Sequence, residues 1–130
     1  MNHDHLIEAA KKVRNRAYAA YSGFFVGAAL QDEHGNIFTG CNVENSSFPQ
    51  GSCAEGNAIG AMIVGGGRKI DTIAVVGGHK QLEDCSPCGG CRQAIREFSD
   101  SNTRIIILGE SGDFVEYSID DLLPKSFQLK

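Results

Sequence analysis

The chain has 130 residues, which is enough for one compact domain and too few for two separate hydrophobic cores. Hydrophobic residues make up 42% of the chain and charged residues 22%, which is the balance of a folded domain and not of a disordered one. The net charge of -4 disfavours a nucleic-acid substrate, and no apolar run reaches the length of a membrane helix. We therefore expect a single domain over residues 1–130, located in the cytoplasm.

The first half of the chain shows one helical pattern followed by two short apolar runs. Apolar residues recur every three or four positions across residues 4–19, which predicts an amphipathic helix. Residues 24–30 form an apolar run that predicts a largely buried strand. Because Gly35 and Asn36 separate this run from a second one at Ile37–Cys41, a β-hairpin is the simplest account.

The second half of the chain alternates between helical and strand patterns. A helix is predicted over residues 53–64, and three consecutive glycines at 65–67 then end it. These glycines are not typical of a phosphate-binding loop, because they follow a helix instead of preceding one. The alternation indicates an α/β sheet covered by helices. The other predicted elements are a strand at 72–76, a helix from Pro87 to about Phe98, a strand at Arg104–Leu108 and a weaker strand at 114–118.

Three of the five cysteines stand in positions typical of a zinc site. Cys88 and Cys91 form a CxxC pair, and the two glycines between them let the backbone turn tightly around one ion. Cys53 is the third, and these cysteines fall where two predicted helices begin, which stabilises thiolates electrostatically. Three thiolates with an open fourth position describe a catalytic zinc site.

A CxxC pair alone also fits a thiol redox motif, half of a structural zinc site, or two buried small residues. The order Cys-Ala-Glu at 53–55 followed by Pro-Cys-Gly-Gly-Cys at 87–91 is far more specific, because zinc deaminases carry this signature. A fourth thiolate from Cys85 would leave no coordination position for water, so we interpret Cys85 as a bystander. Cys41 ends a predicted strand and is expected to be a small buried residue.

Glu55 follows Cys53 by two residues and is the candidate proton carrier. Zinc lowers the pKa of a bound water, and a carboxylate beside it can take that proton and return it to the substrate. In isolation, a glutamate at a helix start has a simpler interpretation, since it favours the helix dipole. The position of Glu55 beside an open zinc site favours the catalytic role.

With these residues in view, nearly the whole chain resembles the small homotetrameric cytidine deaminases, from the FFVGAA run at 24–29 to the LLP run at 122–124. The resemblance implies a three-layer α/β/α sandwich with a five-stranded mixed sheet. It implies a Zn²⁺ cofactor and hydrolytic deamination of cytidine and deoxycytidine to uridine and deoxyuridine. In that reaction, water activated by zinc attacks C4 of the base and Glu55 moves the protons. The resemblance also implies a homotetramer with active sites at subunit junctions.

The same resemblance assigns substrate contacts to six further residues. Without it, Asn42 is equally well explained as a turn residue, Glu44 as a solvated charge and any phenylalanine as core packing. The six are Phe24 on the pyrimidine ring, Asn42 and Glu44 on the sugar hydroxyls, the main-chain groups around Ala54 and Ser86 on the base edge, and Phe127, which reaches the base from a neighbouring subunit.

Two residues depart from the family pattern. Gly56 stands where relatives usually have an arginine, which offsets the charge of three thiolates. We hypothesise that helix N–H groups supply most of this compensation, with Arg92 or Asn57 assisting. Phe48 stands where many relatives have tyrosine, so one hydroxyl hydrogen bond near the sugar or a subunit contact is lost, at a cost of about 1 kcal/mol.

Other functions stay open at this point. The missing arginine is compatible with a deaminase of a modified cytosine nucleoside, such as the blasticidin S deaminases, although residues 42–45 and Phe127 favour ordinary nucleosides. A purely structural zinc module would need a fourth protein ligand and no Glu55. Polynucleotide deamination is disfavoured because the acidic chain offers no basic stripe. We expect small-molecule nucleoside substrates, with no nucleic-acid or membrane partner.

Overall fold

A five-stranded sheet forms the middle layer of the computed structural model, which describes residues 3–129. The strands are β1 (Phe25–Asp32), β2 (Ile37–Cys41), β3 (Ile70–Gly78), β4 (Arg104–Leu108) and β5 (Phe114–Tyr117). Their order across the sheet is β2-β1-β3-β4-β5. The central pair β3 and β4 runs parallel and the other neighbours run antiparallel, so the sheet is mixed as expected, and β1 and β2 form the predicted hairpin.

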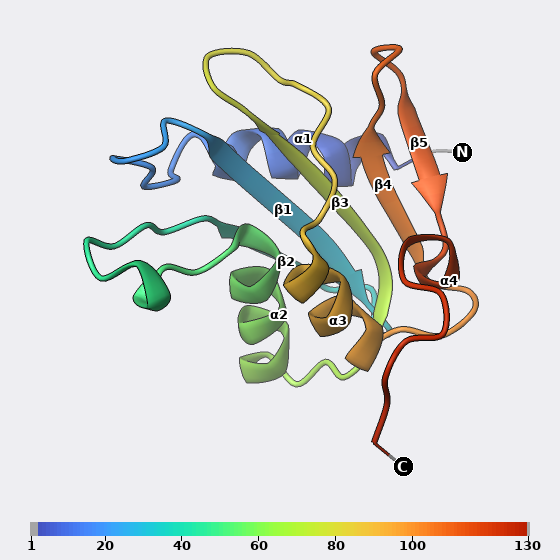
Figure 1. Cartoon of the computed structure of the whole chain (residues 1–130). Helices are drawn as coiled ribbons and strands as arrows, with labels where there is room; N and C mark the ends of the chain where they lie inside the picture. Colours follow the sequence, from blue (N-terminus) through green and yellow to red (C-terminus); the bar gives the residue numbers. More distant parts are fainter. Residues whose placement is uncertain (1–2, 130) are drawn as a thin grey trace.

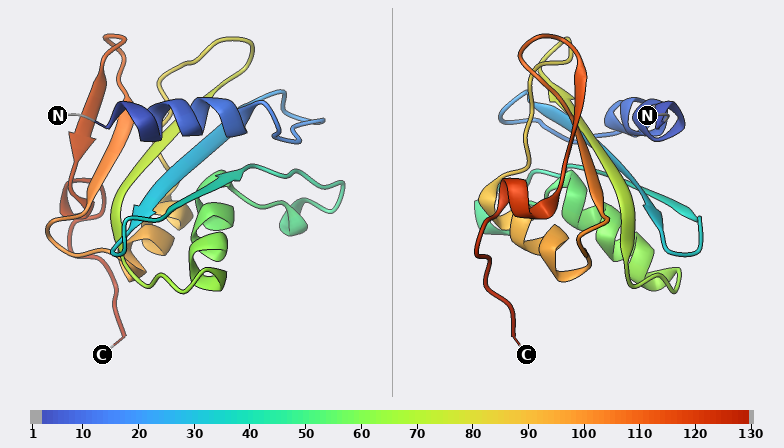
Figure 2. Two further views of the ribbon diagram at one scale, coloured as in Figure 1. Left: turned by 180° about the vertical axis from the view of Figure 1, so that it is seen from behind. Right: turned by 90° about the vertical axis from the view of Figure 1, so that its right-hand side faces the viewer.

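Helices cover both faces of this sheet. One face carries α1 (Asp4–Arg14), and the other carries α2 (Ala54–Val64) and α3 (Gly89–Glu97), as Figures 1 and 2 show. A short helix, α4 (Ile119–Leu122), follows β5, and a 3₁₀ turn, η1 (Phe48–Gln50), lies between β2 and α2. The expected three-layer α/β/α sandwich is therefore confirmed. No helix within residues 3–129 has the length and apolar character that crossing a bilayer needs.

Each face of the sheet has its own hydrophobic core. The core under α1 is made of buried side chains from this helix and from β1, β3 and β4, among them Leu6, Ala10, Ala29, Val76 and Ile106. The core under α2 and α3 includes Leu30, Ala58, Met62, Ile73, Ile95 and Ile105. Because burial of apolar surface is the main favourable term in folding, this second core fixes α2 and α3 on the same side of the sheet.

Gly40 lets α2 approach the sheet very closely. A Cβ atom at this position would lie 2.5 Å from the carbonyl oxygen of Ala54 and would also overlap the backbone nitrogen of Ala58. Only glycine therefore fits here without moving the helix. This close approach fixes the distance between the first turn of α2 and the sheet.

Several boundaries differ from the sequence prediction. The first helix ends at Arg14 and not at residue 19, because the backbone of Tyr18 pairs with Asn42 and Glu44 at distances of 3.0 and 2.9 Å. The predicted strand at 72–76 extends from Ile70 to Gly78. The three glycines do end α2, and Gly66 has the left-handed φ of 95° that favours glycine. Neither α4 nor η1 was predicted.

Candidate active site

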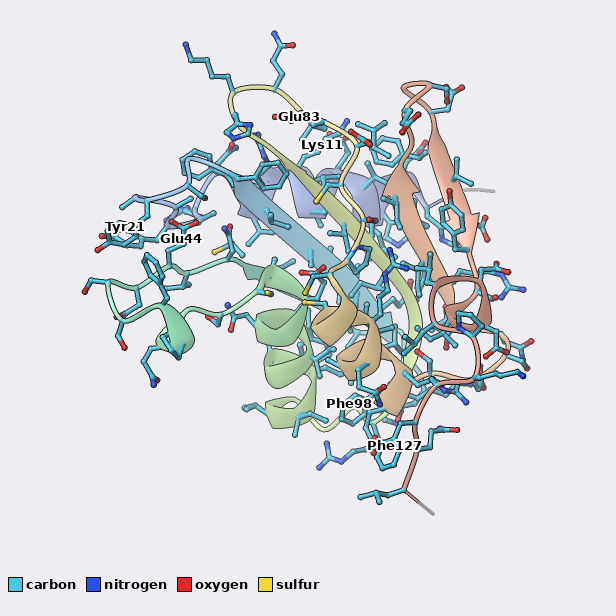
Figure 3. All side chains as sticks on the ribbon, in the orientation of Figure 1. Lys11, Tyr21, Glu44, Glu83, Phe98 and Phe127 are labelled. Atoms are coloured by element: carbon cyan, nitrogen blue, oxygen red, sulfur yellow. The ribbon has the colours of Figure 1, made fainter. Side chains whose placement is uncertain are left out.

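The three cysteines of the predicted zinc site come together where α2 and α3 begin. Cys53 occupies the N-cap position of α2, Cys88 caps the N-terminus of α3, and Cys91 lies in the first turn of α3. Their sulfur atoms all lie within 4.8 Å of one another. Figure 3 shows sulfur atoms gathered at these two helix starts. The two-helix arrangement therefore brings together residues that are far apart in the sequence.

The geometry and charge of this cluster fit a zinc ion. Three sulfurs around one tetrahedral zinc stand about 3.8 Å apart, given a Zn–S distance of about 2.3 Å. The backbone N–H of Cys91 donates to the Cys88 sulfur at 3.4 Å and lowers the pKa of the Cys88 thiol. Burial, followed by the nearby charge of Glu55, raises the pKa of Cys91. A divalent cation between the sulfurs offsets this repulsion and favours the thiolates.

Glu55 lies in the first turn of α2, directly beside the sulfur cluster. Its side chain is buried, with only 4% of the residue exposed. This burial raises the pKa of Glu55 above the ordinary glutamate value, and hydrogen bonds with its own backbone N–H and then with Cys91 partly offset the shift. A carboxyl group whose pKa is raised above its ordinary value holds a proton more readily, which suits a group that takes up and returns protons.

One pocket of about 190 Å³ contains the sulfur cluster, Glu55 and most of the predicted substrate contacts. Eight of the ten predicted site residues line it, and these are Phe24, Asn42, Cys53, Ala54, Glu55, Ser86, Cys88 and Cys91. Val26 and Cys85 complete the lining, and the sequence reasoning had assigned neither to the site. The two-residue spacing from Phe24 could have predicted Val26 as a lining residue, because alternate side chains of extended backbone point to the same face.

Cys85 stands at the wall of the pocket but outside the cluster of three sulfurs. Burial raises the pKa of its thiol to about 11, so it is a neutral group at physiological pH. Its sulfur lies against Gly77 of β3, where a Cβ would come within 2.7 Å of it. Cys85 and Ser86 also border a larger depression of about 380 Å³, which Arg92, Glu110 and Tyr117 line on the other side.

The structure places Glu44 in a neighbouring pocket of about 290 Å³, together with Tyr21 and Phe48. Its carboxylate accepts hydrogen bonds from the backbone nitrogens of Tyr21 and Ser22, at 2.9 and 3.1 Å, and from the Ser22 hydroxyl. The bonds from Ser22, followed by that from Tyr21, lower the pKa of Glu44. Glu44 is therefore an ionised acceptor held at the edge of the site.

Phe127 lies on the C-terminal tail, and 69% of it is exposed. Its carbonyl oxygen accepts a hydrogen bond from the Gln93 side chain at 3.0 Å, which ties the tail to α3. Figure 3 shows Phe127 at the opposite end of the molecule from Tyr21 and Glu44. Within one chain, Phe127 is therefore separated from the zinc pocket.

Asn57 and Arg92, the two side chains expected to assist in place of the family arginine, form hydrogen bonds with oxygen atoms. Gly56 is exposed on α2, and a Cβ there would meet nothing within 4 Å. Asn57 donates to the Cys41 carbonyl at 2.8 Å and to the Ser52 hydroxyl at 3.0 Å. Arg92 donates to the carbonyls of Pro87 and Leu122, both at 2.8 Å. The backbone N–H of Cys91 donates to the Cys88 sulfur, which is the kind of contact that the helix-based hypothesis requires.

Comparison with known proteins places this site in a family. The sequence profile described as "Cytidine and deoxycytidylate deaminase zinc-binding region" matches residues 1–108. The cytidine deaminase of Sporosarcina psychrophila is 40% identical over 98% of this chain and 92% of its own length. That of Mycoplasma genitalium is 38% identical over 98% of this chain and 97% of its own.

Solved structures agree with the sequence comparison. The crystal structure of the cytidine deaminase from Burkholderia pseudomallei has a TM-score of 0.87 and 43% identity, covering 98% of this chain and 100% of that one. The Mycobacterium tuberculosis enzyme has a TM-score of 0.85 and 35% identity, and the match covers 99% of both chains. With its three clustered cysteines and the buried glutamate beside them, the chain belongs to the cytidine and deoxycytidylate deaminase family of enzymes.

Proposed function

We propose that this protein catalyses the hydrolytic deamination of cytidine and deoxycytidine, which consumes water and yields uridine or deoxyuridine and ammonia. The observation that supports this most strongly is the single pocket that joins Cys53, Cys88 and Cys91 to the buried Glu55. A structural zinc site would close its coordination sphere with a fourth protein ligand. The cluster within residues 3–129 offers three cysteines, as a catalytic site does.

The roles of the residues follow from their positions. The three cysteines hold Zn²⁺, which, when bound, supplies a Lewis acid that lowers the pKa of a coordinated water. The Glu55 carboxylate takes a proton from the attacking water and delivers it to the base, whose C4 amino group leaves as ammonia. Because Glu55 is only 4% exposed, bulk water does not compete for this proton.

The remaining lining residues suit a nucleoside. Phe24 offers a flat ring against which the pyrimidine packs, and the main-chain groups around Ala54 and Ser86 read the base edge. Asn42 reaches the sugar from the same pocket. Glu44, two residues along, accepts from a sugar hydroxyl at the border of the neighbouring pocket. A base without its sugar leaves these polar groups unpaired and binds more weakly.

Assembly into a homotetramer would complete the site. Phe127 is 69% exposed and separated from the pocket of its own chain, so in this proposal it enters the pocket of a neighbouring subunit. Phe48 is 77% exposed and contacts Tyr21 edge-on, with ring centroids 6.3 Å apart. In this proposal these exposed aromatic side chains lie at contacts between subunits, where aromatic residues are enriched. Light scattering on the purified protein tests the tetramer, and a stable monomer that is fully active would contradict it.

The experiment that tests the proposed activity is a substrate panel. Zinc-loaded protein is incubated with cytidine, deoxycytidine, cytosine and blasticidin S, and loss of absorbance is followed beside a Glu55→Ala control. Turnover of the two simple nucleosides that disappears in Glu55→Ala supports the proposal. Turnover of blasticidin S alone would assign the chain to the deaminases of modified nucleosides. An absence of turnover by zinc-loaded protein would reject the activity altogether.

A further inference from the structure

The loop after β3 brings a second aromatic side chain against Phe24. His79 meets Phe24 edge to face, with ring centroids 5.1 Å apart and the ring planes at 87°. Phe24 lines the zinc pocket, whereas His79 lines a separate depression with Arg14 and Lys80. His79 therefore contacts Phe24 without entering the substrate pocket, and any effect on the substrate passes through the Phe24 ring.

Glu83 fixes the orientation of the His79 ring. One carboxylate oxygen of Glu83 accepts the backbone N–H of His79 at 2.7 Å and lies 2.8 Å from the His79 Nδ1 atom. In neutral histidine this contact places the ring proton on Nδ1, because a carboxylate only accepts. The backbone of Glu83 in turn donates to the Gly77 carbonyl at 2.8 Å, which closes the loop. Figure 3 labels Glu83 on this loop.

Arg14 ties together the two backbone segments that carry the rings. From the last turn of α1, its guanidinium donates to the Phe25 carbonyl at 2.9 Å. It also donates to the carbonyls of Gly78 and His79, at 2.8 and 2.9 Å. The start of β1 and the end of β3 are therefore held by one side chain, which keeps His79 beside Phe24.

We propose that His79, held by Glu83, is a positioning residue that fixes the ring of Phe24 in the orientation that packs on the pyrimidine. The inference rests on the proposed function and adds to it a specific determinant of nucleoside binding. Fixing an aromatic side chain before the ligand arrives removes part of the ordering cost of binding. Because Phe24 contacts the base both before and during the reaction, the effect falls on KM and not on kcat.

Steady-state kinetics with cytidine tests this chain of contacts. His79→Ala and Glu83→Ala are expected to raise KM about two- to tenfold, which is the usual range for loss of an aromatic pair, with kcat within about twofold. Glu83→Gln keeps the acceptor oxygen and is expected to restore the wild-type KM. Lys80→Ala is the matched control, because it changes the neighbouring residue and leaves the two rings in place.

A double-mutant cycle separates positioning from a general structural effect. In a Phe24→Ala background, His79→Ala is expected to raise KM no further, since the ring on which it acts is gone. An equal rise of KM in both backgrounds, or an unchanged KM in His79→Ala, would overturn the proposal. Thermal unfolding shows whether each variant keeps its fold. If His79→Ala does not, the comparison of KM between Glu83→Ala and Glu83→Gln tests the positioning role.

An NMR measurement keeps the inference independent of turnover. With ¹³C-labelled phenylalanine rings and a Phe24→Leu spectrum for assignment, the Phe24 signals should shift in His79→Ala and Glu83→Ala but remain in place in Glu83→Gln and Lys80→Ala. Unchanged Phe24 signals in His79→Ala would reject the positioning role even in an active enzyme. If wild-type protein fails to deaminate cytidine, the proposed function is rejected, and the ring signals still decide whether His79 positions Phe24.

Discussion

Asn42 holds Phe24 and the start of β1, the strand that follows it. Its side-chain nitrogen donates to the Phe24 carbonyl at 2.9 Å, and its side-chain oxygen accepts the backbone N–H of Val26 at 2.8 Å. The residue that was expected to contact the sugar is thus also the residue that fixes the start of β1 against the end of β2. One of its two amide protons and one lone pair of its oxygen remain available for a ligand.

Asn42→Ala should therefore damage both stability and binding. The substitution leaves the Phe24 carbonyl and the Val26 N–H unpaired, which costs about 1–3 kcal/mol of the free energy of unfolding. It should also raise KM for cytidine. Asn45→Ala is the control, because the Asn45 side chain accepts only a local hydrogen bond from the backbone of Ser47. Denaturant unfolding that shows equal losses in the two variants would contradict the role given to Asn42.

Gly40→Ala should displace the helix that carries Cys53 and Glu55. The added methyl group would lie 2.5 Å from the Ala54 carbonyl oxygen, so α2 must move. Overpacking of this kind typically lowers the free energy of unfolding by about 1–3 kcal/mol. Gly109→Ala is the comparison, since a Cβ there meets its nearest atom at an ordinary 3.5 Å. Urea unfolding should show a clear loss for the first variant and a change within about 0.5 kcal/mol for the second.

Arg92→Ala should weaken zinc binding without removing a ligand. Arg92 joins the Pro87 carbonyl, next to Cys88, to the Leu122 carbonyl in α4. Loss of groups that hold metal ligands in place typically costs about 10–100-fold in metal affinity. Gln93→Ala removes a side-chain hydrogen bond from the same helix, to the tail at Phe127, and should leave the affinity unchanged. Competition with a chromophoric chelator measures the zinc affinity of each variant. Equal zinc affinities for Arg92→Ala and Gln93→Ala would show that Arg92 does not support the zinc site.

Glu44 should make the free energy of unfolding depend on pH in the acidic range. Hydrogen bonds from the Ser22 hydroxyl and from the backbone of Ser22 and Tyr21 hold the folded-state pKa of Glu44 below its ordinary value of 4.5. As the pH falls below that value, the unfolded state takes up this proton first, so the stabilisation is present above it and lost on acidification. The stability difference between wild type and Glu44→Gln should therefore shrink as the pH falls from about 6 to below the folded-state pKa of Glu44. A difference that stays constant would contradict the assigned bonds.

Local patterns in the sequence predict most of this fold. The β-branched runs predicted β3 and β4, and the apolar periodicity predicted α1 and α2, because each pattern reports which face an element buries. The prediction of α3 came from Pro87, which suits the first turn of a helix. The early end of α1 could not be predicted, since it depends on pairing of Tyr18 with Asn42 and Glu44, which lie far along the chain. The helix α4 did have a signal, because Ser118 and Asp121 form a capping box.

The core of the site was predictable for a different reason. The zinc signature consists of residues at two helix starts, and each helix start is a local feature that the sequence displays. The pairing of Phe24 with His79 has no such signal, because it depends on the register of β1 and β3, which places Phe25 opposite Gly78. The place that the proposed tetramer gives to Phe127, at the pocket of a neighbouring subunit, could not be read from local patterns either.

The most direct measurement of the central claim follows ammonia release and uridine formation from cytidine by protein loaded with one zinc per chain. Wild-type protein should convert cytidine, lose activity when a chelator removes zinc and regain it when zinc is restored. Glu55→Gln should bind zinc as tightly yet turn over more slowly by at least about 10²-fold, because the proton carrier is gone. Zinc-loaded wild type that forms no uridine, or Glu55→Gln with wild-type turnover, would contradict the account.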